Sequence, residues 1–247
     1  MIPLKSEEDL KVLREAGKIL SGIMKRLREK VKPGISTREL DLLAEELILE
    51  NEVLPAFKNY KGYPATLCAS VNNEIVHGIP DERCLLEGDI ISLDLGIISR
   101  GYYSDAAITV GVGEINPKIQ KFIEVAKKSL AEGIKEAQAG NQLFDISHAI
   151  QSYAEKHGFS VVRQFVGHGI GKQLHEDPEI PNFGAAHQGP LLKEGMVLAI
   201  EPMINMGGWE SEILDNGWTA VTKDGSLSAH FEHTVAITKE GVEILTV

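Results

Sequence analysis

The chain has 247 residues, 43% of them hydrophobic and 25% charged, and is long enough to bury a sizeable core without disulfide or metal staples. With 25 Lys and Arg against 36 Asp and Glu, its formal net charge is −11, which argues against nucleic acid or another polyanion as the main ligand. Two cysteines, Cys68 and Cys84, are too few for a disulfide framework. No secretory signal and no apolar run of about 20 residues that could span a membrane is visible, so we expect a cytoplasmic protein.

Two helices are predicted at the start of the chain. Ser6, with Asp9 three residues later, resembles a capping box and precedes apolar residues at helical spacing, until Lys32-Pro33-Gly34 ends the pattern. A second capping box, Ser36 with Glu39, opens an amphipathic helix.

Strands and a second pair of helices follow. Residues 54–112 are rich in β-branched residues and punctuated by Gly and Pro, which is typical of strands. Asn116-Pro117 supplies an N-cap and a proline at the first helical position, and this helix is expected to run toward residues 139–140. Another helix is predicted over residues 144–157, after which strand-like segments continue to the end of the chain.

The order helix, helix, strands therefore occurs twice, and two sequence matches indicate an internal duplication. The segment EGDIISLD, ending at Asp94, matches EGMVLAIE, ending at Glu201. Asp105 before AAITV then matches Glu232 before HTVAI. The offset grows from 107 to 127 residues between the two matches, so the extra residues of the second half are predicted to lie in the loop over residues 206–217.

The duplication predicts a single domain over residues 1–247, with halves of about 1–113 and 114–247 that share one core. It also places four carboxylates in equivalent positions, each inside or at the end of an apolar strand. Any one of them is as well explained by a turn or a solvated strand face. Four anionic side chains on one sheet would repel one another strongly unless neutralised, and two divalent cations would balance their charge.

Three of the eight histidines lie in unusual local sequences: His77 in EIVHGIP, His168 in VGHGIG and His175 in LHEDP. The glycines beside His168 allow the backbone to approach another segment closely. Any one of these histidines could equally be a hydrogen-bonded core residue, and His230 fits either reading. A ligand set of carboxylates with one imidazole suits Mn, Fe, Co, Mg or Zn better than an ion that prefers thiolates.

The sequence resembles the methionine aminopeptidases of the short bacterial type I class over essentially its whole length. The matching stretches are SVNNEIVHGIP, SLDLG, SDAA, FVGHGIGKQLHEDP, AIEPM and SLSAHFEHTVAIT. The resemblance implies the α/β (α+β) pita-bread fold, in which pseudo-twofold duplicated halves form a curved antiparallel sheet flanked by helices. It also implies a metal-dependent aminopeptidase that removes initiator methionine from nascent chains when the second residue is small, by attack of a metal-bridging hydroxide.

The same resemblance implies two divalent metal ions, drawn from Co, Mn, Fe, Zn and Mg, and five metal ligands. Asp105 and Glu232 would bridge the two ions, Asp94 would bind one of them, and His168 with Glu201 would bind the other. Glu201 would also act as the proton shuttle.

Further roles follow from the same resemblance. His175 would steady the scissile carbonyl and the tetrahedral intermediate, and His77 would contact the substrate backbone near the new amine. Asn72 and Ser228 match a site for one monovalent cation. The positions that match the wall of the methionine pocket are Tyr60, Tyr63, Cys68, Leu174 and Trp218. Tyrosine and tryptophan also pack into ordinary cores, and Leu174 replaces an aromatic residue found in some relatives.

Two other classes of protein compete with this prediction. X-Pro aminopeptidases and prolidases share the ligands and both histidines, but usually carry a separate N-terminal domain for which this chain is too short. A peptide-binding module on the same fold would generally lose metal ligands, and all five positions are filled here. The expected partners are the N-terminal peptides of nascent chains, with a transient ribosome contact, no membrane and no specific nucleic acid, and the chain is expected to be a monomer.

Overall fold

All four predicted helices are present, and three of them begin at the expected caps. The computed structural model describes residues 2–247, so Met1 lies outside the described residues. The capping boxes at Ser6 and Ser36 both form, as does the cap at Asn116. The helices are α1 (Glu7–Lys30), α2 (Thr37–Glu50), α3 (Pro117–Glu136) and α4 (Leu143–Lys156). Helix α3 ends earlier than predicted, because the chain turns there and the Gly140 N–H donates to the Leu192 carbonyl.

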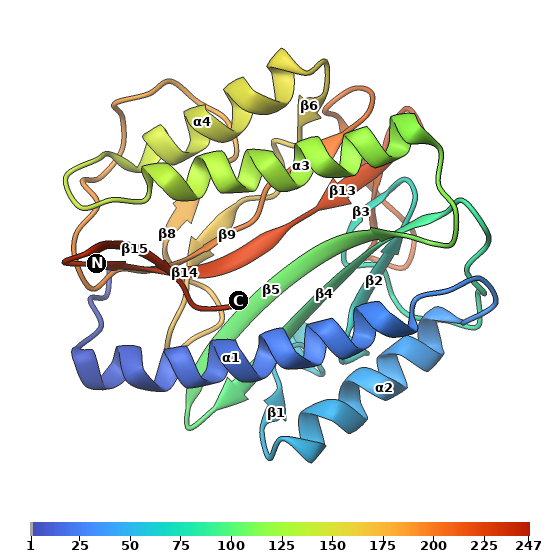
Figure 1. Cartoon of the computed structure of the whole chain (residues 1–247), viewed down its shortest axis with the longest axis horizontal. Coiled ribbons are helices and arrows are strands. Elements are labelled where there is room, and N and C mark those ends of the chain that lie inside the picture. Colours follow the sequence, from blue (N-terminus) through green and yellow to red (C-terminus); the bar gives the residue numbers. More distant parts are fainter. Residues whose placement is uncertain (1) are drawn as a thin grey trace.

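A curved antiparallel sheet joins the two halves of the chain (Figure 1). Its nine strands run in the order β1-β4-β5-β14-β9-β7-β8, with β2 paired to β4 and β15 paired to β14. These strands are β1 (Leu54–Pro55), β2 (Cys68–Val71), β4 (Ile90–Ser99), β5 (Tyr102–Gly111), β7 (Gly167–Gly169), β8 (Glu176–Ile180), β9 (Val197–Ile200), β14 (Glu232–Thr238) and β15 (Gly241–Ile244).

The strand order has the symmetry that the repeated sequence predicts. In the first half β4 pairs with β5, in the second half β9 pairs with β14, and β5 and β14 pair with each other at the centre. The two matched segments of the sequence are therefore neighbouring strands in each half, and the halves meet along the second strand of each.

Two smaller sheets lie beside the large one. One is β13-β10-β6, built from β13 (Ser228–His230), β10 (Met203–Asn205) and β6 (Ser160–Val161). The other is β11-β12-β3, built from β11 (Ser211–Ile213), β12 (Ala220–Thr222) and β3 (Glu74–Val76). The extra residues of the second half thus form part of a hairpin rather than a plain loop. A short 3-10 turn spans Tyr60–Gly62.

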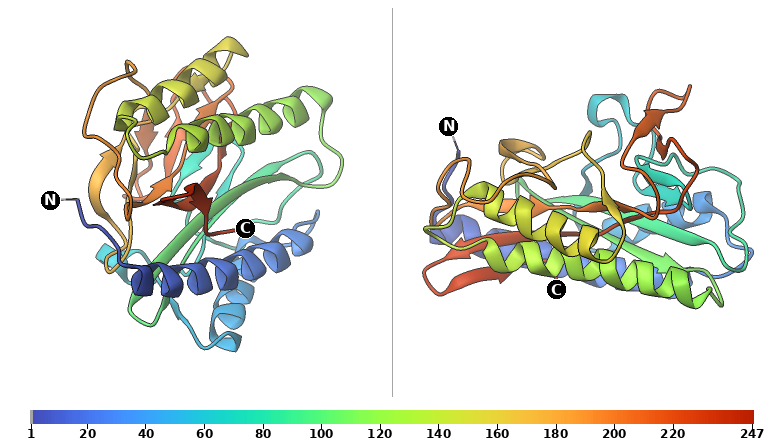
Figure 2. Two further views of the ribbon diagram at one scale, coloured as in Figure 1. Left: turned by 60° about the vertical axis from the view of Figure 1, so that its left-hand side comes forward. Right: turned by 90° about the horizontal axis from the view of Figure 1, so that it is seen from above.

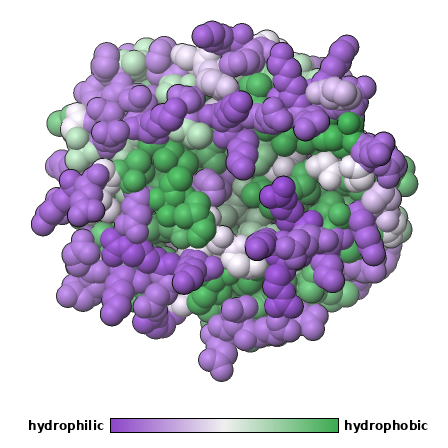
Figure 3. All heavy atoms as spheres, viewed as in Figure 1, coloured by the Kyte–Doolittle hydropathy of each residue, from purple (hydrophilic) through white to green (hydrophobic). Residues whose placement is uncertain are grey.

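Helices α3 and α4 and the β11–β12 hairpin lie on opposite faces of the large sheet (Figure 2). Between α1 and α3, apolar side chains reach the surface over the C-terminal strands (Figure 3), where Val242 and Ile244 are partly buried against the core. No helix within residues 2–247 is long and apolar enough to cross a membrane.

Candidate active site

The pleat of the central strands aims the predicted carboxylates away from the helices. Leu93 and Leu95 of β4 pack in the core beneath α1 and α2, as does Ala106 of β5. Because successive side chains along a strand point to opposite faces, Asp94 and Asp105 face the other side of the sheet. One face of each strand packs in the core and the other lines a cavity, which is why an otherwise apolar strand carries a carboxylate.

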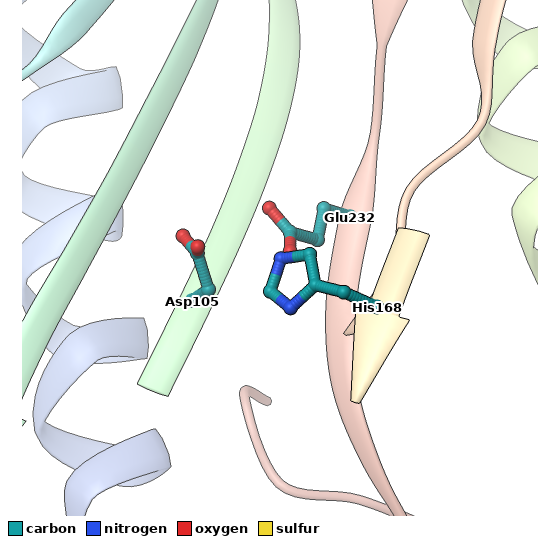
Figure 4. Close-up of side chains that lie close together, drawn as sticks. All are labelled: Asp105, His168 and Glu232. Atoms are coloured by element: carbon teal, nitrogen blue, oxygen red, sulfur yellow. The ribbon is translucent and has the colours of Figure 1, made fainter. Parts of the chain in front are cut away.

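Three side chains from different strands converge on that face. Asp105 of β5, His168 of β7 and Glu232 of β14 each offer a ligand atom within 4.8 Å of the others (Figure 4). Glu201, which directly follows β9, places its Oε1 atom 3.4 Å from His168 Nε2. The His168 Nδ1 atom lies 2.9 Å from the Gly169 carbonyl oxygen, which leaves Nε2 facing the carboxylates. Asp94 lies on β4 beside Asp105 and lines the same cavity.

The glycines beside His168 are required by close strand packing. A Cβ atom on Gly167 would lie 2.4 Å from the Ala199 carbonyl oxygen, and one on Gly169 would lie 2.1 Å from the Asp177 carbonyl oxygen. Either side chain would push β7 away from its neighbours. The close backbone approach predicted from the sequence is therefore to the adjacent strands, and it fixes the height of the His168 ring above the sheet.

Burial makes these carboxyl groups unfavourable as free anions. Burial, with the charges of neighbouring carboxylates, raises the pKa of Asp94, Glu201 and Glu232 well above the usual range, and burial raises the pKa of Asp105 to about 7. Burial lowers the pKa of His168 to about 3, so the imidazole is neutral and its Nε2 atom can bind a cation.

Unpartnered oxygens complete the case for cations at this site. Asp94 Oδ1, Asp105 Oδ1 and Glu232 Oε1 are buried without a hydrogen-bond partner among the described residues. Buried polar atoms without partners are costly, and bound cations would satisfy them and cancel the repulsion between the carboxylates. The donor set of oxygens with one imidazole fits divalent ions such as Mn, Fe, Co or Zn.

The same cluster should make the metal-free protein less stable as the pH rises. The pKa of Asp105 is about 7 in the folded chain against an ordinary value of 3.8. Between these values an unfolded chain releases the proton while the folded chain keeps it, so the free energy of unfolding falls with rising pH. We expect the melting temperature of chelator-treated protein to fall between about pH 4 and pH 7 relative to the Mn²⁺-loaded protein. Parallel pH profiles with and without Mn²⁺ would contradict this.

A cavity of about 300 Å³ opens above the cluster and is lined by every residue predicted for catalysis, divalent-metal binding or the pocket wall, but not by Asn72 or Ser228. Two lining residues, Phe57 and Lys61, were not predicted, and no motif in the sequence singles them out. The lining residues are Phe57, Tyr60, Lys61, Tyr63, Cys68, His77, Asp94, Asp105, His168, Leu174, His175, Glu201, Trp218 and Glu232.

The His175 ring lies between the metal-ligand cluster and the pocket wall. Its ring centre is 4.4 Å from that of His168, and its Nδ1 atom lies 2.8 Å from the Tyr60 hydroxyl. Burial, together with the charge of Lys61, lowers the pKa of His175 below its usual value. The hydrogen bond to Tyr60 fixes the rotation of the ring, so Nε2 is the nitrogen left for a substrate.

His77 lines the same cavity in a conformation that few non-glycine residues adopt, with φ of +60°. Its ring makes edge contacts with Phe165 and Trp218, at ring-centre distances of 5.7 and 6.4 Å. Burial lowers the pKa of His77 to about 4, so it is neutral at physiological pH and can donate or accept a hydrogen bond.

The pocket wall combines aromatic edges with small apolar groups. The Tyr63 ring meets the Trp218 ring edge-on at 5.2 Å, while the Tyr63 hydroxyl donates to the Leu67 and Gly78 carbonyls. Cys68 is buried, and burial raises the pKa of its thiol, so it behaves as a small neutral group. The hydroxyl of Tyr63 is thus taken up in holding the wall, and only its ring faces the cavity.

Two further polar residues match the proposed site for a monovalent cation. Asn72 and Ser228, the pair matched to a monovalent cation, are neighbours, because the Ser228 N–H donates to the Asn72 carbonyl at 2.9 Å. The Asn72 side chain is already hydrogen-bonded to Asp89 and to the Ile90 N–H.

His230, whose role the sequence left open, is buried with Nε2 at 3.5 Å from Glu201 Oε2. His230 is the last residue of β13, and Glu232 begins β14, the next strand along the chain. This closeness in sequence to a predicted ligand is the only signal that could have pointed to His230.

Comparison with known proteins agrees with this geometry. The model of metallopeptidase family M24 matches residues 11–239. The chain belongs to this family. It is 54% identical to a methionine aminopeptidase of Clostridium perfringens over 100% of this chain and 99% of that protein. The crystal structure of a methionine aminopeptidase from Rickettsia prowazekii superposes with a TM-score of 0.99 at 42% identity, covering 100% of both chains.

The fold of family M24 is also found in a more distant protein. A prolidase from Pyrococcus horikoshii matches 99% of this chain with a TM-score of 0.78, but at 24% identity and over only 63% of its own length. This likeness shows the fold alone. Together the structural matches confirm the expected pita-bread fold, with its curved antiparallel sheet and flanking helices.

Proposed function

We propose that this M24 metallopeptidase is a methionine aminopeptidase that removes the initiator methionine from nascent chains whose second residue is small. The observation that carries the proposal is a single cavity with acidic ligands on its floor and aromatic and small apolar groups on its wall. The relatives that are named methionine aminopeptidases match over the whole chain, which supports the same activity here.

In this proposal Asp94, Asp105, His168, Glu201 and Glu232 hold two divalent ions. Such ions, when bound, lower the pKa of water enough to supply a nucleophile near neutral pH and polarise the scissile carbonyl. Asp105 of β5 and Glu232 of β14 would be shared by the two ions, and Asp94, His168 and Glu201 would complete the ligand set. Cobalt, manganese, iron, zinc and magnesium remain the candidates, and one monovalent cation is proposed near Asn72 and Ser228.

The protein groups around these ligands would orient the substrate and move its protons. The Glu201 carboxylate would accept a proton from the attacking water and deliver it to the leaving amine. His175, held by Tyr60, presents Nε2 to the scissile carbonyl and to the oxyanion that develops from it. His77 faces the peptide beyond the cleaved bond.

The proposed specificity follows from the pocket wall. Methionine is slim and unbranched, and its sulfur interacts favourably with aromatic edges. Tyr63 and Trp218 provide such edges, Tyr60 flanks them, and Leu174 and Cys68 fill the remaining wall without charge. Apart from Lys61, whose ammonium lies 5.4 Å from the centre of the Tyr60 ring, this wall carries no charge, which favours a thioether over a charged side chain of the same length.

We also propose that residues 1–247 form one catalytic domain with halves of about 1–113 and 114–247, which the continuous nine-stranded sheet supports. The chain would act as a monomer in the cytoplasm on the N-terminal peptides of nascent chains, with a transient contact to the ribosome. Cys68 and Cys84 are both free thiols, as suits a reducing compartment.

The substrate test compares two tripeptides after the protein is stripped with chelator and reloaded with Mn²⁺ or Co²⁺. We expect metal-dependent release of free methionine from Met-Ala-Ser and little release of alanine from Ala-Pro-Ser. Preferential cleavage of Ala-Pro-Ser would overturn the proposed substrate while leaving the metal site intact. Absence of hydrolysis with either peptide across several metals would favour a peptide-binding module.

A further inference from the structure

A buried ion pair ties the start of the chain to the hairpin that carries His168 and His175. The ammonium of Lys5 contacts the carboxylate of Glu176, with side chains only 6% and 8% exposed. Charges that are this well buried are tolerated when they are paired, and removing one partner leaves the other uncompensated. Lys5 lies in the segment before α1, which descends past the second half of the sheet (Figure 2), and its N–H donates to the Gly195 carbonyl at 2.7 Å.

Glu176 is the residue after His175 and the first residue of β8. One oxygen of its carboxylate, Oε1, accepts a hydrogen bond from the Gln173 N–H at 3.2 Å, and the other, Oε2, accepts from Lys5. The same carboxylate therefore closes the turn that contains His175 and connects that turn to a segment 171 residues away in the chain.

Gly171 lacks a side chain and so leaves the space that the end of the Lys5 side chain occupies. A Cβ atom there would lie 2.3 Å from Lys5 Cε and 2.9 Å from Glu176 Oε1, so a side chain at this position would force the ion pair to shift. On the strand side, the Tyr103 N–H donates to the Gly171 carbonyl at 2.7 Å. The turn between His168 and His175 is thus held by β5 on one side and by Lys5 on the other.

We propose that Lys5 is a positioning residue for catalysis: its ion pair with Glu176 fixes the backbone of the turn that presents His175 to the substrate. This inference rests on the role proposed above for His175. Tyr60 sets the rotation of the imidazole ring, whereas Lys5 sets where the ring is placed relative to the cluster of metal ligands. A displacement of about 1 Å at such a group can cost about 100-fold in rate.

The test uses the full chain loaded with Mn²⁺ and compares Lys5→Met with Lys5→Arg. We expect Lys5→Met to lower kcat for Met-Ala-Ser by about 10- to 100-fold, with KM and Mn²⁺ affinity unchanged, because the turn moves while the ligands stay. Lys5→Arg, which keeps the charge, should recover most of kcat. Calorimetric titration with Mn²⁺ supplies the readout that is independent of activity.

Arg14→Met is the control at a second long-range ion pair, whose side chains are more exposed, at 38% and 37%. Arg14 Nε lies 2.8 Å from Glu243 Oε1 and ties α1 to β15 without touching the hairpin. This variant should lower the melting temperature and leave kcat unchanged. If it lowers kcat as much as Lys5→Met does, the effect is general destabilisation and the proposal fails.

A double-mutant cycle keeps the proposal testable if Lys5→Met folds poorly. Glu176→Gln should reproduce the loss of kcat, and the double variant should be no slower than the slower single variant, because both changes break one contact. Unchanged kcat in both single variants, losses that add in the double variant, or a parallel loss of Mn²⁺ affinity would each overturn the proposal. If these variants are fully active while His175→Ala is not, only the role of Lys5 fails; a fully active His175→Ala overturns both roles.

Discussion

Replacing Asp105 or Glu232 with alanine should abolish both metal binding and aminopeptidase activity. These two residues come from the paired central strands β5 and β14, and their carboxylates lie within reach of the same ligand atom of His168. Loss of either one removes a ligand that both ions would share, so the affinity for both should fall together. Metal content by elemental analysis and hydrolysis of Met-Ala-Ser measure the two losses separately, and full activity in either variant would overturn the bridging assignment.

Two comparisons separate this effect from unfolding. Asp105→Asn keeps the shape of the side chain and removes one crowded buried carboxyl, so the metal-free variant at neutral pH should melt at or above the temperature of the metal-free parent. Asp145→Ala provides the control, since its carboxylate accepts from the Gln142 N–H at the start of α4 and from the His187 N–H of a distant loop, each at 2.8 Å. That variant should lose stability and retain both metal and kcat.

His175→Ala should separate chemistry from metal binding. Its Nε2 is the nitrogen that Tyr60 leaves free to face the substrate, and loss of one preorganised donor to a developing oxyanion costs about 100- to 1000-fold in kcat. The metal content should remain that of the parent protein, because His175 is not one of the five proposed ligands and its Nδ1 atom is already hydrogen-bonded to Tyr60. Single-turnover hydrolysis together with elemental analysis tests both parts, and loss of metal in this variant would show that His175 is itself a ligand.

Tyr60→Phe offers a graded comparison for the same group. The change removes the hydroxyl that lies 2.8 Å from His175 Nδ1 while keeping the ring that is stacked against the imidazole. A loss of kcat smaller than that of His175→Ala would fit a role in orienting the ring. His148→Ala on α4, which removes an exposed histidine far from the cavity, should leave kcat unchanged.

Local rules predicted the helices well because their determinants lie within a few residues. Both predicted capping boxes form, and Asn116 caps the third helix as expected. The end of that helix was placed too late, since the signals after residue 136 are weak and the turn is fixed by Leu192, far along the chain. Helix ends that depend on distant contacts are the part of a fold that the periodicity of the sequence predicts least accurately.

The four carboxylates at the centre of the site were predictable because the duplicated sequence shows the same pattern in both halves. Two strands in each half carry a carboxylate at a matching position, and the observed strand order puts those strands side by side. Phe57 and Lys61 were missed because their approach to the cavity depends on a short turn whose path no local pattern specifies. The ion pair of Lys5 with Glu176 was missed for the same reason, since nothing near either residue indicates the other.

The pairing of β5 with β14 has a consequence for how the chain is made. Synthesis proceeds from the N-terminus, and the strand at the centre of the sheet is among the last in chain order. Until β14 emerges, β5 is paired only with β4, and its other edge lacks the partner that meets it at Ala106 and Ala107; an open edge is the form in which strands most readily pair with other chains. The most vulnerable moment for this protein therefore comes late in translation, and the arrival of one strand closes the edge and assembles the site at the same time.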